Sequence, residues 1–194
     1  MSQIFQNLEL QAFRAGITPR TKESREWFRK KANSLRRINR EALMKESPLQ
    51  QTNQEIVGSM YMFFYDPKHK ETLPYYDKFP LVVVVGPAEG GFYGLNLHYL
   101  PPILRAQMLD ALMGITTNTK FNKSTRFKMS YELLARTAKL KYFKPCFKHY
   151  LNEHVQSRFA LVPALEWEIA TFLPTAQFEK AGKNKIYSDS RKMV

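Results

Sequence analysis

The residues from Ser59 to Pro102 decide the fold that the sequence predicts. They read SMYMFFYDPKHKETLPYYDKFPLVVVVGPAEGGFYGLNLHYLPP and combine dense β-formers with punctuating turns. The four consecutive valines within Leu81 to Val85 predict the least ambiguous strand of the chain. Ser59 to Tyr65 and Phe92 to Leu100 predict two further strands, one before a proline-containing loop and one after a glycine-rich turn. We expect this stretch to be the folded nucleus.

Three short, curved and aromatic-rich strands joined by irregular loops predict an α+β fold on a small SH3-like antiparallel β-barrel. A simple antiparallel meander packed against helices is the main alternative. Gly94, inside the third strand, predicts a bulge or a sharp bend there.

Helices are expected on both sides of this nucleus. Apolar spacing and breaker residues place helices at 2–15, 21–45, 103–113, 130–143 and 146–159, and short strands at 159–162 and 166–173. Thr21 is the predicted N-cap of the second helix. The predicted plan is a basic helical arm and linker over residues 1–55, a globular α+β core over 56–179, and an extended basic tail over 180–194.

The formal net charge of +13 lies on the flanks of the chain. Residues 1–50 carry 11 basic and 5 acidic side chains, residues 51–118 carry 4 and 6, and residues 119–194 carry 15 and 6. Such a distribution is typical of contact with nucleic acid, with an anionic membrane surface or with acidic neighbours in an assembly. Charge alone does not choose among these.

Cysteine content and hydropathy narrow the class of protein. Cys146 is the only cysteine, so the chain forms no internal disulfide and no multi-cysteine zinc site, which favours a reducing compartment. The N-terminus lacks a basic segment followed by a long apolar stretch, and no window of 18 uninterrupted apolar residues occurs. We therefore expect a soluble, unprocessed protein without a membrane partner.

No catalytic or metal-binding pattern is evident in the sequence. The glycines from Gly86 to Gly94 lack the spacing of a phosphate-binding loop and precede a strand where such a loop needs a helix. The four histidines, at positions 69, 98, 149 and 154, have no metal-ligand spacing. A set of carboxylates that could serve a metal-dependent nuclease is Asp66, Asp77, Glu89 and Asp110, although turn capping and salt bridges explain them better. The prediction is a non-enzyme with no cofactor, no metal and no small-molecule substrate.

Basic residues interleaved with aromatics are the remaining positive signal, as in Phe147-Lys148-His149-Tyr150. Cations bind phosphates and aromatic rings stack on bases, so this pattern fits nucleic-acid binding, but it also fits core aromatics flanked by solvated lysines. The predicted partner-binding residues lie in the two flanks: Arg25, Arg29, Lys30, Arg36, Arg37, Arg40, Lys183, Lys185 and Arg191.

Several segments together resemble a known family. These are YDPKHKETLPYYDKFPLVVVV (65–85), GFYGLNLHYLPP (91–102), YFKPCFKHYL (142–151), SRF (157–159), EWEIATFLP (166–174) and KIYSDSR (185–191). In this pattern the chain is similar to small basic virion-associated proteins of large T-even-type contractile-tailed bacteriophages. The resemblance covers about residues 58–191 and implies no catalytic residue.

The resemblance and the charge together predict a non-enzymatic structural subunit of a phage virion, in the tail, baseplate or neck. Its basic arms would bind neighbouring virion proteins, and its location would be the virion, or the host cytoplasm during assembly. The alternative is a DNA-binding protein that acts on phage DNA ends or in packaging, with DNA as the partner. A metal-dependent nuclease is a remote third reading.

Overall fold

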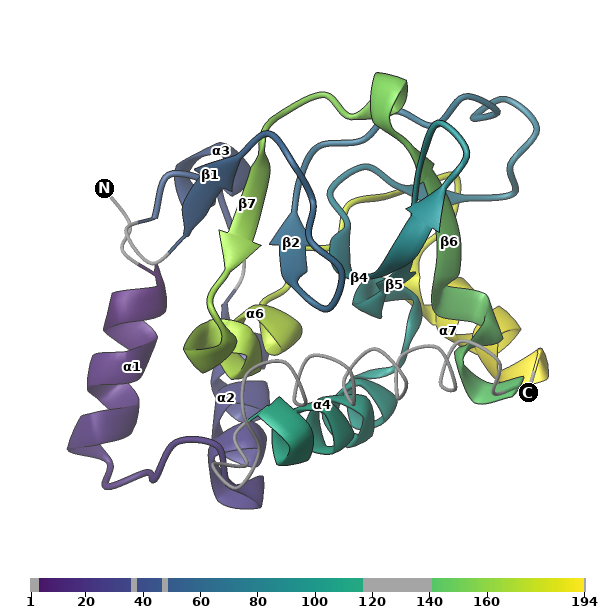
Figure 1. Cartoon of the computed structure of the whole chain (residues 1–194). Helices are drawn as coiled ribbons and strands as arrows, with labels where there is room; N and C mark the ends of the chain where they lie inside the picture. Colours follow the sequence, from purple (N-terminus) through teal and green to yellow (C-terminus); the bar gives the residue numbers. More distant parts are fainter. Residues whose placement is uncertain (1–3, 36–37, 47–48, 117–140, 194) are drawn as a thin grey trace.

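The computed structural model describes residues 4–35, 38–46, 49–116 and 141–193 (Figure 1). Its elements, in chain order, are α1 (Ile4–Arg14), α2 (Lys22–Ser34), α3 (Arg40–Leu43), β1 (Gln50–Thr52), β2 (Met60–Met62), β3 (Tyr76–Asp77), β4 (Leu81–Ala88), β5 (Gly91–Asn96), η1 (Leu97–Tyr99), α4 (Pro102–Thr116), η2 (Lys141–Cys146), β6 (Phe147–Leu151), η3 (Asn152–His154), β7 (Phe159–Val162), η4 (Ala164–Glu166), α6 (Trp167–Phe172), β8 (Phe178–Glu179) and α7 (Lys183–Lys192). The predicted helix at 130–143 lies almost wholly outside the described residues.

A six-stranded antiparallel sheet is the centre of the molecule, with the strand order β1-β7-β2-β4-β5-β6 (Figure 1). A separate two-stranded ladder joins β3 to β8. Helices α2, α4 and α6 lie below the sheet in Figure 1, where α6 contacts both of the others. The α+β class is thus confirmed.

Both faces of the sheet are buried along the central strands β2 and β4, which explains why the valine run is continuous rather than alternating. Leu81, Val83 and Val85 belong to the cluster on the helix side, and Val82 and Val84 face the other way. The second face carries an aromatic cluster, which we define by its buried members: Tyr61, Phe63, Tyr65, Val82, Val84, Phe92, Tyr150 and Phe159. Phe63 makes edge-to-face contacts at its centre.

The sheet curls strongly around the aromatic cluster but does not close. The ring centroids of Phe92 in β5 and Phe159 in β7 are 5.7 Å apart, although β2 and β4 separate their strands. Within the described residues β1 and β6 are the two edges, and a single bridge from Tyr65 to Val155 joins the chain beyond β2 to the chain beyond β6. One bridge is not a ladder, so the sheet is open rather than a closed barrel, and the SH3-like part of the prediction is not confirmed.

The second helix begins at its predicted N-cap but ends earlier than predicted. Thr21 is the N-cap of α2, and its side chain accepts from the Ser24 amide in a reciprocal capping box. The predicted single helix over 21–45 is instead two, because Leu35 is extended and Asn39 caps the short helix α3.

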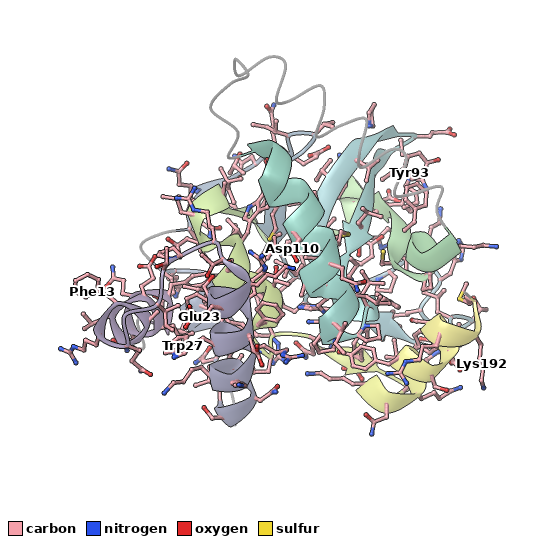
Figure 2. The ribbon with its side chains drawn as sticks, turned by 90° about the horizontal axis from the view of Figure 1, so that it is seen from below. Phe13, Glu23, Trp27, Tyr93, Asp110 and Lys192 are labelled. Atoms are coloured by element: carbon pink, nitrogen blue, oxygen red, sulfur yellow. The ribbon has the colours of Figure 1, made fainter. Side chains whose placement is uncertain are left out.

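The segments predicted as arms are packed parts of the fold. Phe5 in α1 and Leu43 in α3 are fully buried in the same cluster as the helix side of the sheet. Phe13 points away from the body at the end of α1 and is 81% exposed (Figure 2). At the C-terminus, Ile186 anchors the helix α7 to the core where an extended tail was expected.

Three further predictions are wrong about element type. The segment 146–159 forms β6 and η3 rather than a helix, because it pairs residue by residue with β5. The segment 166–173 is mainly α6, whose six residues are all buried, so its apolar run fitted a strand as well as a helix. The expected linker at 47–55 contributes β1, which pairs with β7. Among the described residues no helix is long and apolar enough to cross a membrane.

Candidate functional site

A cavity of about 410 Å³ opens where the loop before β3 meets strands β5 and β6. Its lining combines five tyrosines with basic side chains: Tyr65, Pro67, Lys68, His69, Leu73, Tyr75, Tyr76, Asp77, Asn96, Tyr99, Lys148, His149, Tyr150 and Leu151. We call this cavity the tyrosine pocket. A larger hollow of about 640 Å³ lies beside α3, but the guanidinium that lines it, on Arg40, donates to the carbonyls of Thr175 and Ala176.

Asp77 holds one wall of the tyrosine pocket together. Its carboxylate accepts hydrogen bonds from the amides of Phe79 (3.1 Å) and Gln177 (3.0 Å), and from the side chains of Asn96 (3.2 Å) and His98 (2.6 Å). Burial alone raises the pKa of Asp77, but the interactions with His98, Gln177 and Asn96 outweigh burial and lower it. The group is an ionised carboxylate with its lone pairs occupied.

His98 is fully buried between Asp77 and Thr175, and burial lowers its pKa. Nδ1 lies 2.6 Å from the Asp77 carboxylate and Nε2 lies 3.0 Å from the Thr175 hydroxyl. A neutral ring that donates from Nδ1 and accepts at Nε2 satisfies both contacts. The order Asp-His-Thr resembles a nucleophile triad, but all three side chains are enclosed, so a substrate cannot reach the threonine. The hydrogen bonds of His98 instead hold Asp77 in place on the wall of the tyrosine pocket.

Arg105 places a second buried charge behind this network. Its guanidinium donates to the carbonyls of Leu100 (2.7 Å), His98 (3.1 Å) and Thr171 (3.2 Å), and to the Tyr187 hydroxyl (2.7 Å). These contacts tie α4 to η1, α6 and α7. Arg105 therefore joins η1 and α4, which are neighbours in the sequence, to the more distant helices α6 and α7.

Lys148 supplies the cation of the tyrosine pocket. It lies on the edge strand β6 opposite Gly94, and its Nζ sits 4.2 Å from the centroid of the Tyr99 ring. Burial lowers the pKa of Lys148 and raises the pKa of Tyr99. The irregularity predicted at Gly94 lies on the partner strand: Gly94 pairs with Val84, and the register shifts on β4 between Val84 and Gly86. Glycine is required at position 94 because a Cβ there would lie 2.2 Å from Val82 Cγ1.

The loop at the rim is fixed at two points. Lys180 Nζ donates to the carbonyls of Glu71 (2.8 Å) and Leu73 (3.3 Å), and Lys70 forms an ion pair with Asp66 at 2.8 Å. The loop thereby keeps Tyr75 and Tyr76 partly buried on the pocket wall.

Three of the four carboxylates considered for a nuclease are held in separate contacts. Asp66 pairs with Lys70, Asp77 is enclosed in its own network, and Asp110 pairs with Arg25. In the part of the chain that the structure describes, no group of three or more His, Cys, Asp or Glu side chains could hold a metal ion.

Arg25, a predicted partner-binding residue, has an intramolecular role. It is 9% exposed and pairs with Asp110 and, at 3.2 Å, with Glu168, which also accepts from the Ser24 hydroxyl. These contacts join α2 to α4 and α6, and Figure 2 shows α2 and α4 from the side that carries Asp110.

The other predicted partner-binding residues are spread over separate surfaces. Arg29 and Lys30 pair with Glu26 on α2, Lys185 pairs with Asp189 on α7, and Arg191 is exposed there. The backbone of Lys183 begins α7, and burial lowers the pKa of its side chain. Arg36 and Arg37 lie outside the described residues. Contact of these cations with a partner stays a prediction.

Sequence reasoning missed Tyr99, Lys148 and Tyr150 as parts of one site. The signal was present in the FKHYL segment, which was noted for its alternating basic and aromatic residues but assigned to a helix. With strand periodicity, Lys148 and Tyr150 fall on the same face, toward the pocket.

A family model described as the phage T4 terminal DNA protecting protein matches residues 5–193 of this chain. The chain belongs to this family. No curated protein and no solved structure matches it. The match confirms the predicted origin in T4-like phages. It supports the alternative reading, action on phage DNA ends, better than the main reading of a tail, baseplate or neck subunit.

Proposed function

We propose that this chain, as a member of the terminal DNA protecting protein family, binds the ends of linear duplex DNA and shields them from exonucleases. The observation that carries the proposal is the family match over residues 5–193, almost the whole chain. Protection by binding needs no reaction at the DNA, so the proposal includes no catalytic residue. Binding to other virion proteins remains a prediction of the sequence alone.

The charge of the chain supports this function. Duplex DNA carries one negative charge per roughly 1.7 Å of helix axis, and proteins bind it by releasing condensed counterions. A chain with a net charge of +13 has the sign that such binding requires. The exposed cations of α2 and α7 include Lys30, Lys31, Lys185 and Arg191, and they are suited to phosphates that lie outside the pocket.

The open sheet and its pocket suit the end of a duplex better than its middle. A continuous duplex presents phosphates at its surface, but only an end presents a terminal nucleotide that can enter a cavity of about 410 Å³. Occupation of that terminus would exclude an exonuclease sterically.

The test compares one plasmid in linear and relaxed circular form. We expect the protein to bind the linear form more tightly at moderate salt, and to protect it from a 5′→3′ and from a 3′→5′ duplex exonuclease. The logarithm of the binding constant should fall linearly with the logarithm of salt concentration. Equal binding to linear and circular DNA, with no protection of the linear form, would refute the proposal.

A further inference from the structure

Two tyrosine hydroxyl groups in the tyrosine pocket lack a hydrogen-bond acceptor for their protons. The Leu151 amide donates to the Tyr65 hydroxyl at 3.2 Å, and Asn96 Nδ2 donates to the Tyr150 hydroxyl at 3.1 Å. Each hydroxyl thus uses an oxygen lone pair within the fold, and within the described part of the chain its own proton has no acceptor. Both side chains are largely buried, at 8% and 4% exposure, so an acceptor in the pocket is needed to satisfy them.

Lys148 adds a positive charge to these two hydroxyl donors. Its Nζ lies over the Tyr99 ring, and among the described residues it has neither a hydrogen-bond acceptor nor a carboxylate partner. A partly buried ammonium with three N–H donors and no acceptor among the described residues is stabilised when an anion enters the pocket. The ring contact holds the cation in place without satisfying its donors.

The nearby carboxylate does not act as the missing partner. Asp77 lines the pocket, and its charge opposes an entering anion. However, its four hydrogen bonds occupy both oxygens, and the buried Arg105 guanidinium lies behind it. Asp77 instead orients Asn96, and Asn96 in turn fixes the Tyr150 hydroxyl.

We propose that the tyrosine pocket binds the phosphomonoester of a 5′-phosphorylated DNA end, with Lys148, Tyr65 and Tyr150 as the donors. This inference rests on the proposed binding of DNA ends. A terminal phosphate has three free oxygens and up to two negative charges, which match one ammonium and two hydroxyl donors. Tyr75 and Tyr76 also line the pocket, and stacking on the terminal base is a contact that tyrosine rings suit.

The enclosure favours a terminal over an internal phosphate. An internal phosphodiester is continued by a nucleotide on either side and has only two free oxygens. The donors line a cavity of about 410 Å³, in which the two tyrosines are largely buried and Lys148 is partly buried, so the end of a strand reaches them more readily than its middle. The pocket would therefore recognise the end of a strand rather than its length.

The experiment measures binding to three versions of one labelled DNA: a blunt duplex with 5′-phosphates, the same duplex with 5′-hydroxyls, and a covalently closed circle. We expect the phosphorylated end to bind on the order of 10-fold more tightly than the hydroxyl end, as for one charged hydrogen-bonded contact. Lys148→Met should bring this ratio close to one and change the affinity for the hydroxyl end little. Tyr150→Phe should lower the ratio by a smaller factor.

Lys45→Met is the matched control, because Lys45 is exposed and lies outside the pocket. It removes the same charge, so it should lower the affinity for all three DNAs together and leave the ratio unchanged. Urea unfolding of each variant checks that it is folded. If Lys148→Met does not fold, Tyr150→Phe, which removes one oxygen atom, still decides the question.

Three outcomes separate this inference from the proposed function. Tight but equal binding of phosphorylated and hydroxyl ends, both preferred over the circle, would overturn the phosphate pocket and leave end protection standing. No preference for either linear duplex over the circle would overturn both. Thymidine 5′-monophosphate that binds as tightly as the phosphorylated end would assign the pocket to free nucleotides and overturn its role at DNA ends.

Discussion

Asp77 and Glu166 are both buried carboxylic acids, at 4% and 7% exposure, but their surroundings move their pKa values in opposite directions. Asp77, beside the tyrosine pocket, accepts four hydrogen bonds, and its pKa is lowered. Glu166, at the start of α6, has an Oε2 atom without a partner among the described residues and lies near Glu9. Burial, followed by the contact with Glu9, raises the pKa of Glu166 to about 8.

The difference shows that the hydrogen-bond donors around a buried carboxylic acid, and not the extent of its burial, decide whether it is charged. Beside the tyrosine pocket, two backbone amides, an asparagine side chain and an imidazole donate to the carboxylate of Asp77, and these contacts fix the wall on which the proposed site depends. The carboxyl group of Glu166 has no comparable set of donors, so it must take up a proton when the chain folds at neutral pH. The surroundings of Asp77 stabilise a negative charge, whereas those of Glu166 stabilise the neutral carboxyl group.

The largest expected effect comes from Asp77→Ala. The substitution leaves the donors of His98, Asn96 and Gln177 unsatisfied inside the protein, so we expect a loss of about 3–5 kcal/mol in the free energy of unfolding. Urea unfolding followed by circular dichroism measures it. Asp66→Ala, which removes an exposed ion pair with Lys70, should cost no more than about 1 kcal/mol. Similar losses for the two variants would show that the Asp77 network is not a main support of the fold.

Local signals predicted part of this fold. The valine strand at 81–85 and the Thr21 cap depend on neighbours within a few residues, and both are where the sequence placed them. The type of 146–159 was wrong, because its strand exists through pairing with β5, which local spacing does not reveal.

The candidate site could not be predicted from the sequence, because it too depends on contacts between residues far apart in the chain. Asp77 receives donors from positions 2, 19, 21 and 100 residues further along the chain. Without the sheet register nothing in the sequence relates Gln177 to this aspartate, and a turn anchor was the simplest reading of it. The basic and aromatic pattern around Lys148 was visible, but only the strand geometry turns its cation toward Tyr99.

A smaller effect, of opposite sign, is expected for Glu166→Gln. In the unfolded chain this carboxyl group ionises near 4.5, whereas in the fold it holds its proton up to about pH 8. Its contribution to stability is therefore fully present below about 4.5 and is lost as the pH rises toward 8. The amide removes this loss, so we expect the variant to equal the wild type near pH 4 and to exceed it by about 2 kcal/mol at pH 8.

Glu9→Gln is the matched control for that comparison, because it removes the repulsion and leaves Glu166 buried. It should give a smaller gain of the same sign. A gain for Glu166→Gln that is the same at pH 5 and pH 8 would mean that the carboxyl group is not protonated in the fold.

The smallest expected effect concerns His98 and tests the charge state of the Asp77 network. Burial lowers the pKa of His98 although Asp77 opposes this, and Arg105 and Lys183 act in the same direction as burial. The unfolded chain then binds a proton below about pH 6.5 that the folded chain does not. In the Glu166→Gln background, which lacks the opposite contribution of Glu166, stability should therefore fall by about 1 kcal/mol between pH 7 and pH 5.5. The difference should be absent in His98→Gln and retained in His69→Gln, which changes an exposed histidine. Stability of the Glu166→Gln variant that rises over this range would mean that Asp77 keeps the imidazole charged, and the buried pair would then be an ion pair rather than a carboxylate held by neutral donors.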